Sequence, residues 1–167
     1  MTKINLLNSS VAFLKRNGRY LLMKRDIDRE IAPGLWSGVG GHIEPSELND
    51  PLSTCLREIF EETGIMYDHI FNLELRYIII RRAGDVIRQN YIYFGETDIS
   101  DVADTEEGTL HWVSQTELLE REFTKTYDAM LRHYINASDE KTPVVVGVTE
   151  NINGKLHMSW SDVEDFE

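Results

Sequence analysis

The segment from residue 50 to residue 64 predicts a short helix with two chemically different faces. Asp50 is a good N-cap, Pro51 suits the first helical position, and Gly64 suits the left-handed residue that ends a helix. On a period of about 3.6 residues, an apolar face and an acidic face lie roughly 120° apart. The apolar face comprises Leu52, Cys55, Leu56 and Ile59, and the acidic face comprises Glu58, Glu61 and Glu62. The fold must bury the first face and accommodate the second.

The acidic face favours a cation site. Side chains three and four residues apart on a helix are neighbours, so the carboxylates repel one another unless a positive charge lies among them. All-oxygen ligands suit a hard divalent cation such as Mg²⁺ or Mn²⁺, and Arg57 is placed to orient Glu61. The alternative is a solvated face, the usual meaning of a run of charges. The glycine-rich turn at Gly38, Gly40 and Gly41 favours the site, because backbone there can approach a ligand closely.

The order of these residues resembles the signature of the Nudix hydrolases. That signature is a glycine, five residues, a glutamate, seven residues, and then Arg-Glu-apolar-x-Glu-Glu-x-Gly-apolar. Here five residues separate Gly41 from Glu47, and residues 57–65 match every specified position. The departure is that nine residues lie between Glu47 and Arg57, and we place the extra pair in the turn at residues 48–50.

The resemblance implies roles for the acidic residues. In Nudix enzymes the general base varies, and the candidates here are Glu61 or Glu58 of the helix, or a loop acid outside it. Glu107 precedes Trp112 by five residues, as an additional metal-binding glutamate does in the branch that acts on purine triphosphates. Glu106 is its rival, and an ordinary acidic loop is the alternative. The implied catalytic residues are Glu58, Glu61, Arg57 and Glu47, the last two as a brace, and the implied ligands of Mg²⁺ or Mn²⁺ are Glu58, Glu61, Glu62, Glu107 and the carbonyl of Gly40.

The approach to the signature, residues 34–41, resembles that of MutT-like enzymes of the 8-oxo-dGTP diphosphatase type. These convert oxidised purine nucleoside triphosphates to a monophosphate and pyrophosphate. In one branch an asparagine that contacts the base stands where this sequence has Ser37. Phe123 is consistent with a base-stacking residue or with a core residue of the last helix, and Arg25 with a phosphate- or glutamate-binding residue or a solvated one. The substrate-binding candidates are Arg25, Ser37, Gly41 and Phe123.

Two classes of function follow. The first is a metal-dependent pyrophosphohydrolase of a nucleoside diphosphate-linked substrate, with an oxidised purine triphosphate as first candidate and ADP-ribose, dinucleotide polyphosphates or 5′-triphosphorylated RNA as alternatives. The second is a nucleotide-binding regulatory module without turnover. The intact set of glutamates favours the enzyme, because a binder has no need of three mutually repelling acids.

Charge and composition limit the kinds of molecule that the protein is expected to bind. A net charge of −12 argues against a surface for duplex nucleic acid, which would need a basic stripe. The single cysteine, Cys55, allows no internal disulfide, no apolar run approaches the ~18 residues of a membrane span, and the N-terminus lacks a signal-peptide core. We expect a cytoplasmic protein with a small nucleotide substrate. The oligomeric state stays open, with a homodimer as one option.

The remaining patterns predict an α/β fold, a Nudix-type α/β/α sandwich with a mixed β-sheet and a C-terminal β-hairpin extension. We expect one Nudix domain over residues 1–167, with a core at about 8–137 and the hairpin at about 142–161. Strands are predicted at residues 9–15, 20–24, 72–81, 86–97 and 110–113, with another beginning at Trp36, and a hairpin joins the first two. Residues 114–119 predict a helical turn and residues 123–134 a helix.

Overall fold

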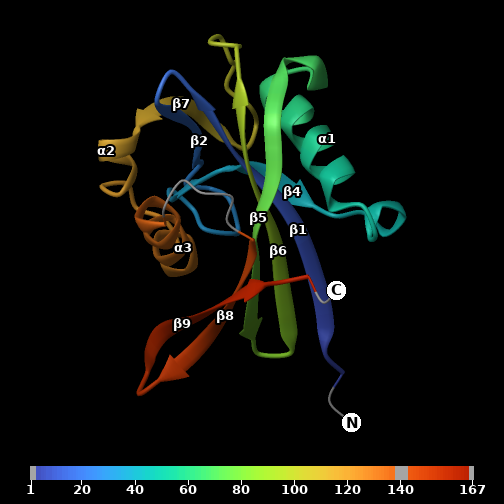
Figure 1. The fold of residues 1–167 in the computed structure, drawn as a ribbon, viewed down its shortest axis with the longest axis vertical. Helices are drawn as coiled ribbons and strands as arrows, with labels where there is room; N and C mark the ends of the chain where they lie inside the picture. The colour runs from blue at the N-terminus through green and yellow to red at the C-terminus, as the bar shows by residue number, and fades with distance from the viewer. Residues whose placement is uncertain (1–2, 138–142, 166–167) are drawn as a thin grey trace.

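The computed structural model describes residues 3–137 and 143–165 and forms three layers (Figure 1). A central sheet has α1 on one face and α2 and α3 on the other. The helices are α1 (Pro51–Thr63), α2 (Gln115–Leu118) and α3 (Lys125–Asn136), with short 3₁₀ turns η1 (Pro45–Glu47) and η2 (Tyr67–His69). The strands are β1 (Asn5–Arg16), β2 (Arg19–Arg25), β3 (Trp36–Ser37), β4 (Val39–His42), β5 (Ile70–Ala83), β6 (Val86–Thr97), β7 (Gly108–Ser114), β8 (Val144–Ile152) and β9 (Lys155–Val163). The predicted α/β sandwich is confirmed.

The sheet is mixed, as predicted. Its strands run in the order β3-β2-β1-β6-β5-β8-β9, with β4 paired to β1 and β7 paired to β2. The β1–β6 and β5–β8 pairs are parallel, and the other pairs are antiparallel. The predicted hairpin at residues 9–24 is present, with its turn at Asn17-Gly18. The strands predicted at residues 72–81 and 86–97 form a second hairpin, with its turn at Gly84-Asp85.

Two hydrophobic cores lie on opposite faces of the sheet because successive residues of a strand point to opposite sides. On β1, Phe13 joins the core under α2 and α3, whereas Ala12 and Leu14 join the core under α1. On β2, Leu22 and Leu21 divide in the same way. This continuous apolar sequence is typical of strands that are covered on both faces.

The caps predicted for α1 are all present. The Asp50 carboxylate accepts from the Ser53 amide at 3.1 Å, and Gly64 adopts a φ of 73° while its amide donates to the Phe60 carbonyl. Cys55 and Ile59 are fully buried as expected, whereas Leu52, predicted in the same apolar face, is 40% exposed. The buried stripe is rotated toward the acidic face, which places Leu52 outside and Glu62 inside.

The last helix begins later than predicted. The Thr124 hydroxyl accepts from the Tyr127 amide and caps α3, so the helix starts at Lys125 and Phe123 lies before it. Phe123 is 9% exposed and forms an isolated bridge with Trp36 of β3. The helical turn predicted at residues 114–119 is present as α2, with Ser114 as its cap.

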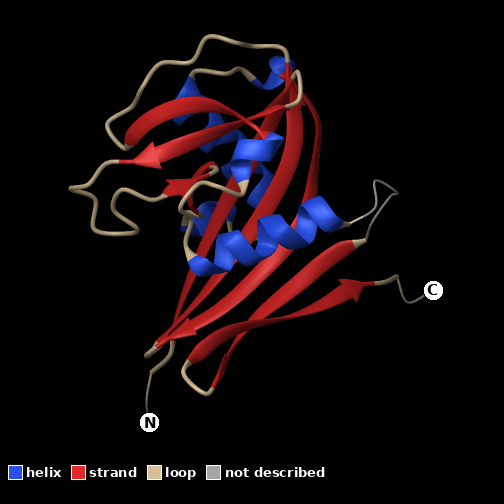
Figure 2. Cartoon of the chain, turned by 90° about the vertical axis from the view of Figure 1, so that its left-hand side faces the viewer, coloured by secondary structure: helices blue, strands red, loops and turns tan. Residues whose placement is uncertain are grey.

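The C-terminal hairpin extends the sheet. β8 pairs in parallel with β5, β9 pairs with β8, and the turn is at Asn153-Gly154, as predicted (Figure 2). A side chain at Gly147 would collide with the Trp160 ring, so the two strands fit together closely. Residue 142, where the hairpin was expected to begin, lies outside the described residues. Within the described residues, no helix is both long enough and apolar enough to cross a membrane.

Candidate active site

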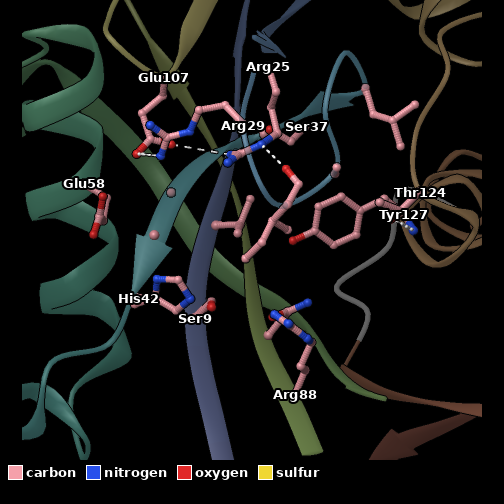
Figure 3. A pocket seen from close by; sticks show the side chains of 18 of the residues that line it. Ser9, Arg25, Arg29, Ser37, His42, Glu58, Arg88, Glu107, Thr124 and Tyr127 are labelled. Carbon is pink, nitrogen blue, oxygen red and sulfur yellow. Dashed lines mark hydrogen bonds and ion pairs between the residues drawn. The ribbon is translucent and has the colours of Figure 1, made fainter. Parts of the chain in front are cut away.

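A cavity of about 990 Å³ opens between β4, α1, the loop after β2, and the start of α3 (Figure 3). This volume lies in the range of pockets that bind small molecules. Its floor extends along β1, β6 and β5. Among the predicted site residues, those that line it are Arg25, Ser37, Gly40, Gly41, Arg57, Glu58 and Glu107. Glu47, Glu61, Glu62 and Phe123 do not.

The glycines of β4 allow two close approaches, one of β1 and one of the Glu58 carboxylate of α1. Gly40 pairs with Val11 of β1, and a side chain at Gly40 would collide with the carbonyl of Ser10. A side chain at Gly41 would collide with the carboxylate of Glu58. Because Gly40 has no side chain, β4 packs closely against β1, and because Gly41 has none, the Glu58 carboxylate lies against the backbone of β4.

Burial raises the pKa of two of the helix glutamates, Glu62 and Glu58. Glu62 is 7% exposed and accepts from the Gly40 amide at 2.8 Å. Burial, with a smaller contribution from the charges of Glu107 and Glu58, raises the pKa of Glu62 to about 8 against the opposing effect of the Gly40 hydrogen bond. Burial also raises the pKa of Glu58. A nearby cation favours the ionised form of such carboxylates, so the donor set fits a divalent metal.

Arg57 connects the signature helix to the turn before it. Its guanidinium donates to Glu47 at 3.0 Å from Nε and from Nη2, to Glu58 at 2.8 Å, to Glu61 at 2.9 Å and to the His42 carbonyl at 3.2 Å. These bonds lower the pKa of Glu47 to about 2. The two extra residues between Glu47 and Arg57 therefore do not separate this pair, which has the geometry of a brace.

The glutamates of α1 do not converge on one point. Glu61 points toward Arg57 and its side chain is 54% exposed, whereas Glu62 points toward Gly40. Within the described parts of the chain, no three His, Cys, Asp or Glu side chains are close enough to hold a cation. Joint ligation by Glu58, Glu61 and Glu62 therefore requires at least one of these side chains to leave its present partner.

Glu107 is held at one end of the cavity by two arginines (Figure 3). Its carboxylate lies 2.7 Å from Arg29 and 3.5 Å from Arg25. The Arg25 side chain is 16% exposed and also donates to the Ile31 carbonyl, so it is not a solvated arginine. Arg29 was missed because it lies in a polar loop with no signature around it, and only the fold brings it to Glu107.

The aromatic wall differs from the prediction. Phe123 is packed in the core and does not line the cavity, so it is not placed to stack on a base there. Tyr127, one turn into α3, lines the cavity instead, and its hydroxyl points inward (Figure 3). Ser37 lines the same cavity from β3. Tyr127 also packs against the core beside Phe13, so a helical pattern in the sequence does not distinguish it from a core residue.

Comparison with known proteins agrees with this geometry. A family model of the NUDIX domain matches residues 6–134. The chain belongs to the Nudix hydrolase family, whose members generally use divalent metals and act on small nucleotides.

One curated relative matches part of the sequence, and solved structures show the same fold at low identity. Over 51 residues the chain is 43% identical to nucleoside triphosphatase NudI of Enterobacter sp. (strain 638); this match covers 30% of the chain and about a third, 35%, of that relative. The crystal structure of the MutT protein of Bacillus halodurans superposes with a TM-score of 0.73 and 19% identity, over 92% of this chain and 97% of that one. The crystal structure of a C. elegans Ap4A hydrolase superposes with a TM-score of 0.61 and 17% sequence identity, over 79% of this chain and 96% of that one.

Proposed function

We propose that the protein is a metal-dependent pyrophosphohydrolase of a nucleoside diphosphate-linked substrate. An oxidised purine nucleoside triphosphate, cleaved to a monophosphate and pyrophosphate, is the first candidate. The observation that carries the proposal is the placement of Glu58 against Gly41 at the wall of a cavity of about 990 Å³, with Glu62 bound behind it to the Gly40 amide. Carboxylates and a nearby backbone carbonyl are the ligands that Mg²⁺ and Mn²⁺ prefer.

The residues that would hold the cation are Glu58, Glu62 and the carbonyl of Gly40, joined by Glu61 and Glu107. When bound, a divalent ion neutralises phosphate charge and lowers the pKa of the attacking water. Arg57 positions Glu58 and Glu61, and a carboxylate freed from such a contact can accept a proton from water. Arg25 and Arg29 hold Glu107 at the cavity through ion pairs.

The walls of the cavity suit a nucleotide. Tyr127 and Trp36 supply aromatic surface and Ser37 supplies a hydroxyl, which together can contact a base by stacking and hydrogen bonding. The similarity to a nucleoside triphosphatase and to MutT supports a triphosphate substrate. The similarity to an Ap4A hydrolase keeps dinucleotide polyphosphates as an alternative within the enzyme class, beside ADP-ribose.

A substrate panel tests the proposal. We expect the purified protein to hydrolyse a P–O–P bond of at least one of 8-oxo-dGTP, dGTP, ATP, ADP-ribose and diadenosine tetraphosphate when Mg²⁺ or Mn²⁺ is present, with the products resolved by chromatography. Glu58→Gln keeps the volume of the side chain and removes its charge, so kcat should fall by about 100-fold or more. Glu74→Gln, an exposed position on β5 away from the cavity, is the control. Nucleotide binding without turnover of any member would instead support the regulatory module.

A further inference from the structure

The end of the cavity away from Glu107 carries two arginines that face each other. Arg81 of β5 and Arg88 of β6 are directly paired in the antiparallel register, and both line the cavity. Side chains directly opposite in such a pair are only about 5 Å apart at Cβ, and like charges there are destabilising. Neither guanidinium has an ion-pair or hydrogen-bond partner among residues 3–137 and 143–165.

The neighbours of these arginines form a polar floor. Ser9 of β1 pairs with His42 on one side and with Asn90 on the other, and all three line the same cavity. Arg88 lies on β6 two residues before Asn90, toward the β5–β6 turn. This face of the sheet is apolar under α3, where Val11 and Ile92 belong to the core, and it becomes polar only toward the β5–β6 turn. The floor therefore offers hydrogen-bond donors with an excess of positive charge, in a protein whose net charge is −12.

This end is distant from the glycine-rich turn. Gly40 lies in register with Val11, and Val11 with Ile92 on β6, so Arg88 is four residues away along the strand. At ~3.3 Å per residue that separation is roughly 13 Å. Tyr127 points into the cavity between the two ends (Figure 3). A group bound at Arg88 and a diphosphate bound at Gly40-Gly41 thus belong to different parts of one ligand.

We infer that Arg81 and Arg88 form a second anion subsite, which binds a phosphate group of the substrate remote from the diphosphate that is cleaved. The substrate class is then a nucleoside diphosphate derivative with an additional phosphate, such as one on a ribose. Guanidinium groups bind phosphate through charge-assisted, often bidentate, hydrogen bonds, and an anion there relieves the repulsion between the two cations. The assignment to substrate rests on the proposed function, whereas anion binding by the pair does not.

The first experiment measures anion binding without catalysis. Inorganic phosphate is titrated into the ¹⁵N-labelled protein in EDTA, and the amide signals of residues 79–90 are followed. We expect saturable shifts centred on Arg81 and Arg88 that disappear in the Arg81→Gln/Arg88→Gln double variant. Arg82→Gln, whose native side chain donates to the Gly84 carbonyl, is the matched control and should behave as the wild type does. Unchanged signals elsewhere show that the double variant is folded; no shift near the pair in the wild type overturns the subsite.

The second experiment separates a free anion from a substrate group. Affinities for ADP-ribose 2′-phosphate and ADP-ribose, which differ by one phosphate, are compared by calorimetry in EDTA. We expect the phosphorylated ligand to bind the wild type at least about tenfold more tightly, and the double variant with no preference. Equal affinities in the wild type would overturn the assignment to substrate even if free phosphate binds. A panel without turnover would overturn the proposed function alone, since both titrations are independent of hydrolysis.

Discussion

The two ends of the cavity differ in how their charged side chains are partnered. Near α1, Arg57 contacts three glutamates and a backbone carbonyl, and nearby Glu107 is held by Arg25 and Arg29. Near the β5–β6 turn, Arg81 and Arg88 face each other without a carboxylate in contact, within the part of the chain that the structure describes. The first end is preorganised before any ligand arrives, whereas the second end is completed by the charge of a ligand.

This difference indicates where each end obtains its stability. Paired charges at a partly buried site support the fold, and removing one partner leaves the others uncompensated. Unpaired like charges reduce the stability of the fold, and they are typical of positions retained for binding rather than for structure. Substitutions at the two ends should therefore have opposite effects on stability.

The largest expected effect is that of Arg57→Ala. This change removes the contacts that position Glu47, Glu58 and Glu61, so we expect kcat/KM to fall by about 100-fold or more. Arg57→Lys should recover little of this loss, because an ammonium cannot reproduce the planar set of donors. Steady-state kinetics with the best substrate of the panel measures both. Arg132→Ala, which removes a pairing with Asp128 on the surface of α3, is the control, and comparable losses in the two would contradict the role of Arg57.

The next effect separates two adjacent glycines. In Gly41→Ala the new methyl displaces the Glu58 carboxylate, a movable group, so kcat/KM should fall by about tenfold while the melting temperature changes little. In Gly40→Ala the methyl collides with the backbone of β1, so the free energy of unfolding should fall by ~1–3 kcal/mol. Thermal unfolding and steady-state kinetics of both variants distinguish the loss of activity from the loss of stability. Equal losses of stability would mean that Glu58 is not free to move.

A smaller effect is the response of stability to acid. Hydrogen bonds from Arg57 lower the pKa of Glu47 from 4.5 to about 2 in the folded state. A lowered pKa stabilises the fold above the unfolded value, and that contribution is lost as the pH falls from about 4.5 toward 2. Urea unfolding of the wild type should weaken more steeply over this window than that of Glu47→Gln. Glu74→Gln is the control, and parallel profiles for wild type and Glu47→Gln would refute the linkage.

The smallest effect is expected at the other end of the cavity. The Arg81→Gln/Arg88→Gln double variant should be slightly more stable than the wild type, by ~0.2–1 kcal/mol, because a repulsion between like charges is removed. The gain should shrink at high salt, which screens exposed charges. Urea unfolding at low and high ionic strength measures it. A loss of stability would show that the two arginines have a structural role after all.

Local signals in the sequence predicted the parts of the fold that depend on neighbouring residues. Asp50, Pro51 and Gly64 act within one helix, and they set the bounds of α1 correctly. Asn17-Gly18 and Asn153-Gly154 formed their hairpins because a turn of this kind depends on few residues. Phe123 is a core residue, as one of its two interpretations held, but it precedes the last helix because the cap at Thr124 decides where α3 begins.

Contacts between residues far apart in the sequence could not be predicted from local signals. Arg29 and Glu107 are 78 residues apart in the sequence, and no local pattern joins them. The opposition of Arg81 and Arg88 depends on the register of two strands, and the position of Tyr127 depends on how α3 lies over the sheet. The family signature indicated Glu58, Glu61 and Glu62, but it did not show that Glu61 pairs with Arg57 while Glu62 accepts from the Gly40 amide.

The parallel pairing of β8 with β5 also determines which edge the sheet presents to other molecules. β8 covers residues 77–80 of β5, an apolar run whose free edge could otherwise pair with a strand of another chain. The outer strand is instead β9, whose exposed positions include Lys155, His157, Ser159 and Asp162. Polar and charged side chains discourage intermolecular strand addition. A chain shortened before residue 143 would uncover the β5 edge, so its first expected fault is self-association into aggregates rather than an altered catalytic site.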